Sequence, residues 1–350
     1  MEICIMDGDF KALGIVESFS SLQWNRKYHG VGSFALTTDA SHTELAKAGA
    51  YAWWNGGERT GIIENVAFDD AKITLSGSFL EKELLYRAIN VSRRYSGNAE
   101  AVMRQIVSDF CIDAPGRRVP LLRLGPGKGL GGKVDVSRMG STVLEALEEI
   151  CLEQELSFFL RYDFKEHAIA FEVFEGLDRT QGQDKNAWCV FSSEFDNVLG
   201  EKYAVARESR NYLYVAGEGE GEGRAVIEID LTGGGKRREL FVDARDLRMR
   251  DDDGKDVPME DYLGLLRTRG MQKAAEHVTV ETVEIKVAPK NTMEYALGDI
   301  CTYANRAIGL VFEKRITEIN TVLEARNVAE NVVLGRAEMS IIDKLKRGGR

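Results

Sequence analysis

The sequence predicts a mainly β protein of the mixed α+β class. Three features lead to this prediction: strand-type alternation in the N-terminal region, two amphipathic helices in the next segment, and a return to alternation after Gly176. The 350 residues suffice for two to four compact units of about 100–200 residues each.

The N-terminal region is predicted to consist mostly of strands. Residues 72–76 alternate polar and apolar side chains, as a half-buried strand does. Gly56 and Gly57 separate the aromatic run 51–54 from the β-rich run 61–63, which predicts a hairpin. Residues 41–48 are predicted to form one short helix between strands.

Two amphipathic helices characterise the middle region. Asn98 is a suitable N-cap, and apolar residues follow it at helical spacing as far as Phe110. A second helix is predicted from Thr142 to Leu156, because Thr142 and Glu145 have the spacing of a capping box. Strands are expected at 157–162 and 168–174. Between the helices, residues 115–132 hold three of the five prolines and six glycines, which predicts an exposed loop.

The C-terminal region returns to strands. Ile227, Ile229 and Leu231 alternate with acidic residues, and residues 282–287 alternate in the same way. A helix at about 260–277 interrupts this region, and the pattern from 299 to 334 is again typical of strands. No fixed-period repeat is visible, although the two β-rich regions are compatible with two similar barrels.

Composition excludes some classes of function. The net charge of −10 argues against a nucleic-acid binder, because lysine and arginine supply most of the affinity for phosphates. Lys344, Lys346, Arg347 and Arg350 form a short basic tail, which is interpreted as a solvated chain end. The N-terminus lacks the pattern of a signal peptide and no apolar run reaches about 20 residues, so synthesis in the cytoplasm and a soluble product are expected.

The five cysteines are scattered and odd in number. No pair has the Cys-x-x-Cys spacing of a zinc or redox site. The sequence therefore predicts free thiols in a reducing compartment. The cysteines are Cys4, Cys111, Cys151, Cys189 and Cys301.

A glycine-rich loop at 127–133 is the strongest candidate for phosphate binding. It matches the first seven positions of a P-loop, and Gly127, Gly129 and Gly132 also fit Gly-x-Gly-x-x-Gly. The next residue is Val134, which cannot bind Mg²⁺ as the P-loop Ser or Thr does, and the residues that follow favour a strand. A flexible loop is the preferred interpretation.

Residues 249–260 have partial calcium-loop spacing. Asp251, Asp253, Gly254 and Glu260 match loop positions, but Met249 offers a thioether where an oxygen ligand is needed. A polar loop that precedes the next helix is preferred. The acidic glycine run at 217–223 is interpreted as a mobile hairpin tip, because three glutamates would repel a pyrophosphate.

No catalytic, cofactor-binding or metal-binding residue is predicted. His29, His42, His167 and His277 are far apart in sequence and lack a metal-binding pattern. The 56 acidic residues leave a glycosidase-type carboxylate pair open, but the sequence singles none out. Trp53 and Trp54 could stack on a sugar or a base; on a strand, one ring should face the core and the other a subunit contact.

Many short motifs, spread over nearly the whole chain, follow one another in the order of a known family. They are Trp24, Asn25, Arg26, Lys27, Tyr28, Gly32, Phe34, Gly61, Ile62, Ile63, Glu64, Gly77, Leu80, Leu84, Arg87, the motif Gly-Leu-Asp-Arg-Thr at 176–180, Phe191, Ser192, Asn197, residues 211–217, Arg238, Glu239, Val242, Asp243, Ala244, Leu297, Gly298, Asp299, Ile300, Arg315 and Ile316. With these motifs the sequence resembles the tail-hub family of long-tailed (siphovirus) phages and prophages, which is related to the baseplate hubs of contractile tails. One departure is Ala296, where the family pattern has an acidic residue.

The resemblance implies two tube-type β-barrel domains with an intervening α+β domain and a helical insertion. The expected division is a first barrel at 1–90, the α+β domain at 91–175, a second barrel at 176–248 and 279–336, the insertion at 249–278 and the basic tail at 337–350.

The resemblance also implies a function. The chain would be a non-catalytic virion protein, a baseplate hub whose homotrimeric ring connects the tail tube to the tail tip, with tail tube, distal tail and tape-measure proteins as partners. An acidic lumen that keeps DNA from adhering during ejection is a further hypothesis. Two alternatives remain at this point: a cell-wall hydrolase of the tail tip, and a module that binds host-surface carbohydrate.

Overall fold

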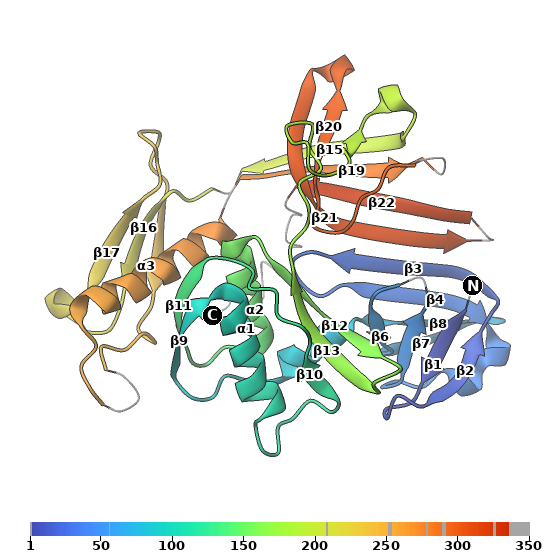
Figure 1. The fold of residues 1–350 in the computed structure, drawn as a ribbon, viewed down its shortest axis with the longest axis horizontal. Coiled ribbons are helices and arrows are strands. Elements are labelled where there is room, and N and C mark those ends of the chain that lie inside the picture. Colours follow the sequence, from blue (N-terminus) through green and yellow to red (C-terminus); the bar gives the residue numbers. More distant parts are fainter. Residues whose placement is uncertain are drawn as a thin grey trace. The chain divides into compact units, whose positions relative to one another are not determined.

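The computed structural model describes residues 2–55, 57–207, 209–250, 254–277, 279–288, 292–324 and 327–335. Strands predominate (Figure 1), which confirms the mainly β class. Contacts divide the chain into two compact units, each assembled from separate stretches. Unit 1 takes Met1–Leu80, Glu175–Arg207 and Thr279–Arg350, and unit 2 takes Glu81–Phe174 and Glu208–Val278. The predicted basic tail at 337–350 lies outside the described residues.

One large antiparallel sheet forms the centre of unit 1. Its main path runs β15-β19-β22-β21-β3-β4-β8-β7, and β14 and β20 branch from it through β21. The strands are β3 (Phe19–Lys27), β4 (Ser33–Asp39), β7 (Asn65–Asp69), β8 (Lys72–Ser78), β14 (Val190–Phe191), β15 (Val198–Arg207), β19 (Thr279–Val287), β20 (Ile300–Asn305), β21 (Leu310–Glu324) and β22 (Asn327–Gly335).

The pairing of β3 with β21 joins the two ends of the chain. Strands β3 and β21 lie side by side (Figure 1), with Trp24 opposite Thr321 and Lys27 opposite Glu318 in the pairing register. The two β-rich regions that the sequence suggests as separate barrels therefore contribute to a single sheet.

The two halves of this sheet have the same spatial order. Outward from the β3–β21 contact, each half starts with a hairpin, β3–β4 in one and β21–β22 in the other. The next pair is β8–β7 in the first half and β19–β15 in the second, with the later strand on the inner side each time. Along the chain, however, the hairpin precedes the outer pair in the first half and follows the outer pair in the second half.

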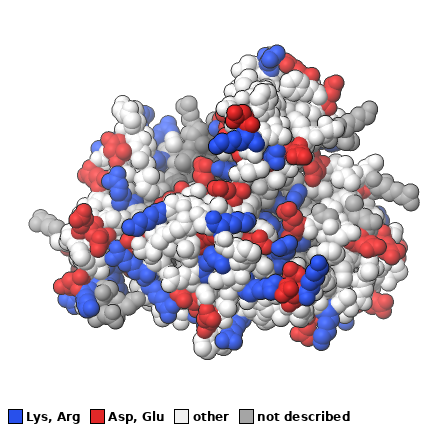
Figure 2. Space-filling view, in the orientation of Figure 1, with Lys and Arg blue, Asp and Glu red and all other residues white. Residues whose placement is uncertain are grey.

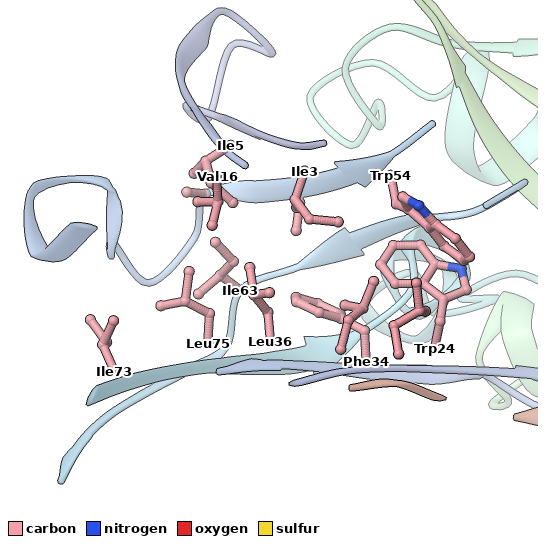
Figure 3. Packing of buried hydrophobic residues seen from close by; sticks show 14 of the residues in the cluster. Ile3, Ile5, Val16, Trp24, Phe34, Leu36, Trp54, Ile63, Ile73 and Leu75 are labelled. Atoms are coloured by element: carbon pink, nitrogen blue, oxygen red, sulfur yellow. The ribbon is translucent and has the colours of Figure 1, made fainter. Parts of the chain in front are cut away.

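A smaller sheet covers the N-terminal half of the large one. It has the order β2-β1-β5-β6 and consists of β1 (Ile3–Met6), β2 (Ala12–Val16), β5 (Tyr51–Trp54) and β6 (Thr60–Ile62). Side chains of both sheets meet in one buried cluster (Figure 3). Trp24 lies at one end of it, with its ring centroid 4.8 Å from that of Phe79 and 5.8 Å from that of Trp54. Aromatic edges packed in this way favour a single arrangement of the two layers.

Unit 2 contains the two predicted amphipathic helices. They are α1 (Ala99–Val107), which continues as a π-helical turn at Ser108–Ile112, and α2 (Val143–Gln154). Asn98 and Thr142 are the N-caps, and Thr142 and Glu145 form the predicted capping box. Five strands accompany the helices: β9 (Arg93–Asn98), β10 (Leu122–Leu124), β11 (Lys133–Arg138), β12 (Ser157–Asp163) and β13 (Ala168–Phe174).

Residues 208–278 form a second small core within unit 2. Helix α3 (Met259–Glu276) covers one face of a sheet with the order β17-β16-β18 (Figure 1). The strands are β16 (Tyr212–Ala216), β17 (Val226–Asp230) and β18 (Glu239–Asp243). Leu213, Val215 and Ile229 from the sheet pack with Tyr262 and Leu266 from the helix.

Short helices complete the chain. The helix predicted at 41–48 is a 3-10 helix, and the loop predicted at 115–132 contains the short strand β10, which pairs in parallel with β13. The 3-10 segments are Ala40–Leu45, Leu80–Tyr86, Ser193–Phe195, Gly221–Gly223 and Arg306–Ile308.

Candidate functional site

The glycine-rich loop binds a carboxylate of its own chain. Glu100, 1% exposed in the first turn of α1, accepts hydrogen bonds from the backbone N–H groups of Lys128 (2.9 and 3.0 Å) and Leu130 (2.9 Å). In a P-loop such N–H groups bind phosphate. Here the Glu100 carboxylate occupies them, and Val134 continues into strand β11 as expected. The loop is exposed as predicted, but Glu100 ties it to α1.

The partial calcium loop cannot be assembled from the described residues. Asp251 and Asp253, two of its candidate ligands, lie outside them. Of the described flanks, the N–H of Met249 donates to the Glu218 carboxylate at 2.6 Å, and Arg250 pairs with Asp256 at 3.0 Å.

The acidic glycine run joins β16 to β17, as the predicted hairpin requires. Arg224 donates to the carbonyl oxygens of Ala216 and Gly217, both at 2.8 Å, and to Asp243. The N–H of Glu218 donates to the Tyr262 hydroxyl at 2.7 Å. The start of the turn is therefore fixed to the sheet and to α3.

The histidines have structural partners. His42 Nδ1 lies 3.2 Å from the Thr38 hydroxyl, and His167 Nδ1 lies 2.7 Å from the Tyr162 hydroxyl. Within the described residues, no group of three or more His, Cys, Asp or Glu is arranged to hold a metal ion.

The adjacent tryptophans alternate as predicted. Trp54 is buried in the core cluster, 7% exposed, whereas Trp53 points the other way and is half-buried. Trp54 is therefore not available as a platform for a sugar ring.

Carboxyl groups were the other chemical candidates. A glycosidase needs one carboxylic acid with a raised pKa. In the described part of the chain, six carboxyl groups have a lowered pKa, which is the opposite of what a general acid needs. Hydrogen bonds from Arg245 and then Arg224 lower the pKa of Asp243 to about 2, and a backbone hydrogen bond from Lys11 lowers that of Asp7. The others are Asp39, Asp163, Asp230 and Glu281.

A continuous polar face on the large sheet is the most extensive feature of unit 1. Residues opposite each other in antiparallel strands share a face, so the pairing registers define its members. We call this the polar face. It consists of Lys202, Ala204, Thr282, Glu284, Lys286, Asn327, Ala329, Asn331, Val333, Glu318, Asn320, Val322, Glu324, Ser21, Gln23, Asn25, Lys27, Ser33, Ala35, Thr37, Asp39, Lys72, Thr74, Ser76, Ser78, Asn65, Ala67 and Asp69.

The polar face crosses all eight strands of the main path without a large apolar side chain other than Val322 and Val333. The reverse face carries the buried residues, for example Trp24, Leu75 and Ile285. Over β15, β19, β22 and β21 the polar face is hollowed, with a volume of about 700 Å³. Lys202, Glu284, Lys286, Glu318, Asn320 and Asn331 are among the residues that line this hollow.

Charges of both signs are mixed on the polar face. The lysines are Lys27, Lys72, Lys202 and Lys286, and the carboxylates are Asp39, Asp69, Glu284, Glu318 and Glu324. Lys202 and Glu284 pair across neighbouring strands at 3.7 Å. Figure 2 shows the two signs interspersed on the visible surface as well. The polar face is therefore close to neutral.

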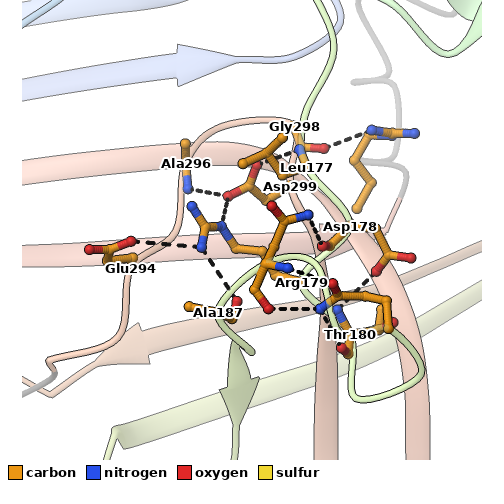
Figure 4. Close-up of polar contacts among 12 residues, drawn as sticks. Leu177, Asp178, Arg179, Thr180, Ala187, Glu294, Ala296, Gly298 and Asp299 are labelled. Atoms are coloured by element: carbon orange, nitrogen blue, oxygen red, sulfur yellow. Dashed lines mark hydrogen bonds and ion pairs between the residues drawn. The ribbon is translucent and has the colours of Figure 1, made fainter.

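Two motifs far apart in the sequence meet at Asp299, which is 2% exposed. Its carboxylate accepts hydrogen bonds from the N–H groups of Leu177 (2.8 Å) and Ala296 (2.9 Å) and from Arg179 Nε at 2.7 Å (Figure 4). Arg179 also lies 3.8 Å from Glu294, which is exposed. We call these contacts the Asp299 network.

Backbone spacing around the Asp299 network requires glycine. Gly298 has φ +96°, and a Cβ there would lie 2.5 Å from the Tyr28 ring. A Cβ on Gly176 would lie 1.9 Å from the Gly298 backbone. The motifs at 176–180 and 297–300 therefore pack closely against each other within unit 1.

The fold is that of phage tail proteins. The chain is similar to a tail protein from Neisseria meningitidis MC58, with 14% identity, a TM-score of 0.56 and 96% of each chain covered. It is also similar to the 43 kDa tail protein of prophage MuSo2 from Shewanella oneidensis, with 14% identity, a TM-score of 0.54 and 96% and 98% covered. Prophage tail protein gp18 from Listeria monocytogenes EGD-e gives 9% identity, a TM-score of 0.60 and 100% and 98% covered.

The family follows from the sequence match. Residues 2–336 match the model of the Siphovirus ReqiPepy6 Gp37-like proteins, and the chain belongs to this family of siphovirus tail proteins. No curated protein matches the sequence. Among the described residues, no helix has the length and apolar character needed to cross a membrane.

Proposed function

We propose that this protein is a non-catalytic structural component of a phage or prophage virion, the baseplate hub whose ring connects the tail tube to the tail tip. The observation that carries the proposal is the polar face, which residues from both ends of the chain build as one surface. A sheet with one apolar side covered within its own unit and one hydrated side suits the wall of a channel.

The charge of the polar face suits passage of DNA. A strongly basic wall would bind phosphates, and the face avoids this by combining hydroxyl and amide side chains with roughly balanced charges. We therefore replace the acidic lumen with a near-neutral, hydrogen-bonding one. The Lys202–Glu284 pair illustrates how lysines on this face are neutralised locally.

The edges of the large sheet support assembly into a ring. The main path ends at β7 and β15, whose outer backbone groups are available to another chain. Both edge strands carry exposed apolar side chains: Phe68 on β7 (59% exposed), and Leu199 (60%) and Val205 (50%) on β15. Apolar residues on open edges are typical of subunit contacts.

The two similar halves of the sheet support a homotrimer as the form of the ring. Three copies would present six halves, which matches a sixfold tail tube. The partners in this proposal are the tail tube, distal tail and tape-measure proteins, and the location is the virion tail. For the two tube domains we propose residues 1–90, and 176–207 with 279–336, since 208–278 has a sheet and core of its own.

Light scattering across a concentration series tests the proposal. The wild-type chain is expected to be a trimer, alone or when mixed with its tail-tube and distal-tail partners. Phe68→Glu places a charge on the β7 edge and should shift the mass toward the monomer. Phe195→Glu is the matched control, because Phe195 is equally exposed (60%) but lies in the 3-10 helix Ser193–Phe195 and not on a strand edge. A wild-type chain that stays monomeric both alone and with these partners would contradict the hub.

A further inference from the structure

Cys189 and Cys301 are neighbours across two parallel strands. In β14 and β20, Val190 lies opposite Thr302 and Phe191 opposite Tyr303. The same register one residue earlier places Cys189 opposite Cys301, and the N–H of Thr302 donates to the carbonyl oxygen of Cys189 at 3.0 Å. Neighbouring strands lie about 4.8 Å apart, within the Cα separation of about 4.4–6.8 Å that a disulfide spans.

The two thiols lie on the same face of the sheet, in the interior. Residues opposite each other in neighbouring strands share a face, and the register of β14 and β20 places Cys189 opposite Cys301. Both residues are 0% exposed. Both thiols are free in this structure, as the sequence predicts, but the fold brings them together although 111 residues lie between them in the sequence.

The surroundings slow oxidation of the folded protein. The interaction with Cys189 and then burial raise the pKa of Cys301. The sulfur of Cys301 therefore stays protonated, and a protonated thiol does not attack a disulfide. Thiol–disulfide exchange at these cysteines therefore requires local opening of the fold, or takes place during folding before the interior closes.

We propose that Cys189 and Cys301 are a dithiol–disulfide pair that a small-molecule disulfide such as oxidised glutathione converts into an intrachain bond. One Cys thiolate attacks the reagent, whose S–S bond breaks and releases one thiol. The second Cys thiolate then attacks the mixed disulfide, which releases the other thiol. The two cysteines lose two protons and two electrons, and the reagent is reduced to two thiols.

The bond would lock the Asp299 network. The N–H of Cys189 donates to the carbonyl oxygen of Arg179 at 2.8 Å, and Asp299 lies two residues before Cys301. The closed loop would also contain the whole segment 208–278. A chain made in a reducing cell and released into an oxidising medium would thus gain a covalent link across unit 1. This inference does not depend on the hub proposal.

Refolding the full chain in a glutathione redox buffer tests the pair. After free thiols are blocked, peptide mapping should find the 189–301 cross-link as the dominant disulfide. The midpoint of thermal unfolding should rise by about 5–10 °C over the reduced protein. Cys301→Ala should abolish both the cross-link and the rise. Cys111→Ala is the control, because it removes another fully buried thiol and should keep both.

Two results would contradict the proposed disulfide between Cys189 and Cys301. One is a refolded chain that still carries reduced Cys189 and Cys301 in the most oxidising buffer. The other is a cross-link that involves Cys4, Cys111 or Cys151 in place of 189–301. Because the oxidant is present from the unfolded state onward, burial of the thiols cannot explain a negative result.

Discussion

Removal of the Asp299 carboxylate should destabilise unit 1 strongly. In Asp299→Ala, the N–H groups of Leu177 and Ala296 lose their acceptor, and Arg179 becomes a cation that is 12% exposed without its 2.7 Å partner. Breaking a buried ion pair by removing one member costs about 3–5 kcal/mol, and the unsatisfied backbone donors place the loss toward the upper end of this range.

Glu294→Ala is the matched control. It removes the second carboxylate near the same guanidinium, at 3.8 Å, but Glu294 is 79% exposed. Solvent screening limits such a pair to about 0–1 kcal/mol. Comparison of the two variants therefore separates the contribution of the buried Arg179–Asp299 pair from that of the exposed Arg179–Glu294 pair.

Tryptophan fluorescence during urea denaturation measures the effect. All four tryptophans, at 24, 53, 54 and 188, belong to unit 1, so the signal reports on this unit alone. With an m-value of about 3 kcal/mol per molar, Asp299→Ala should lower the urea midpoint by about 1–2 M. A midpoint no lower than that of Glu294→Ala would refute the reasoning.

Three further predictions concern other parts of the chain. Glu100→Ala should increase hydrogen exchange of the Lys128 and Leu130 amides about 10–100-fold, because each loses a buried acceptor; unchanged exchange would show that the carboxylate does not order the loop. Gly298→Ala should lower the urea midpoint of unit 1 clearly more than Gly309→Ala, since both have positive φ but a Cβ on Gly309 meets nothing within 4 Å; equal shifts would contradict the close contact with Tyr28. The pKa of Asp243 is lowered from 3.8 to about 2, so its stabilising contribution is present above pH 3.8 and lost as the pH falls through 2; exchange of the Ala244 amide should accelerate across this window in the wild type but not in Asp243→Asn.

Local features of the fold were predictable from the sequence. The caps Asn98 and Thr142, the strands at 157–162 and 168–174, and the helix at 260–277 all appear in the structure. These features depend on side chains within a few residues of one another, and their physical causes can therefore be read along the chain.

Partners in space were not predictable in the same way. Strand alternation shows that Asn25 and Asn320 lie on polar faces, but only the register of β3 and β21 places them opposite each other. The same limit hid the polar face, the proximity of Cys189 to Cys301, and the carboxylate of Glu100 in the glycine loop. For the last of these, the sequence offered only an acidic residue, Glu100, in the first turn of the predicted helix; that it is buried was visible only in the structure.

The opposite chain order of the two halves explains why no repeat was visible. The hairpin β3–β4 precedes the pair β7–β8, whereas β15–β19 precedes the hairpin β21–β22. A fixed-period comparison aligns elements in the order of the chain, so it pairs strands that occupy different places in the sheet.

The pairing of β3 with β21 also affects biosynthesis. Lys27 and Glu318 are about 290 residues apart, so at about 5–20 residues per second the ribosome needs roughly 15–60 s to deliver the partner strand. During this interval the nascent chain carries an unpaired β3 edge next to an apolar cluster. All of unit 2 lies between these two strands in the sequence, so it can fold before β21 has been synthesised. We expect the chain to be most prone to aggregation in this interval, before β21 covers the edge of β3.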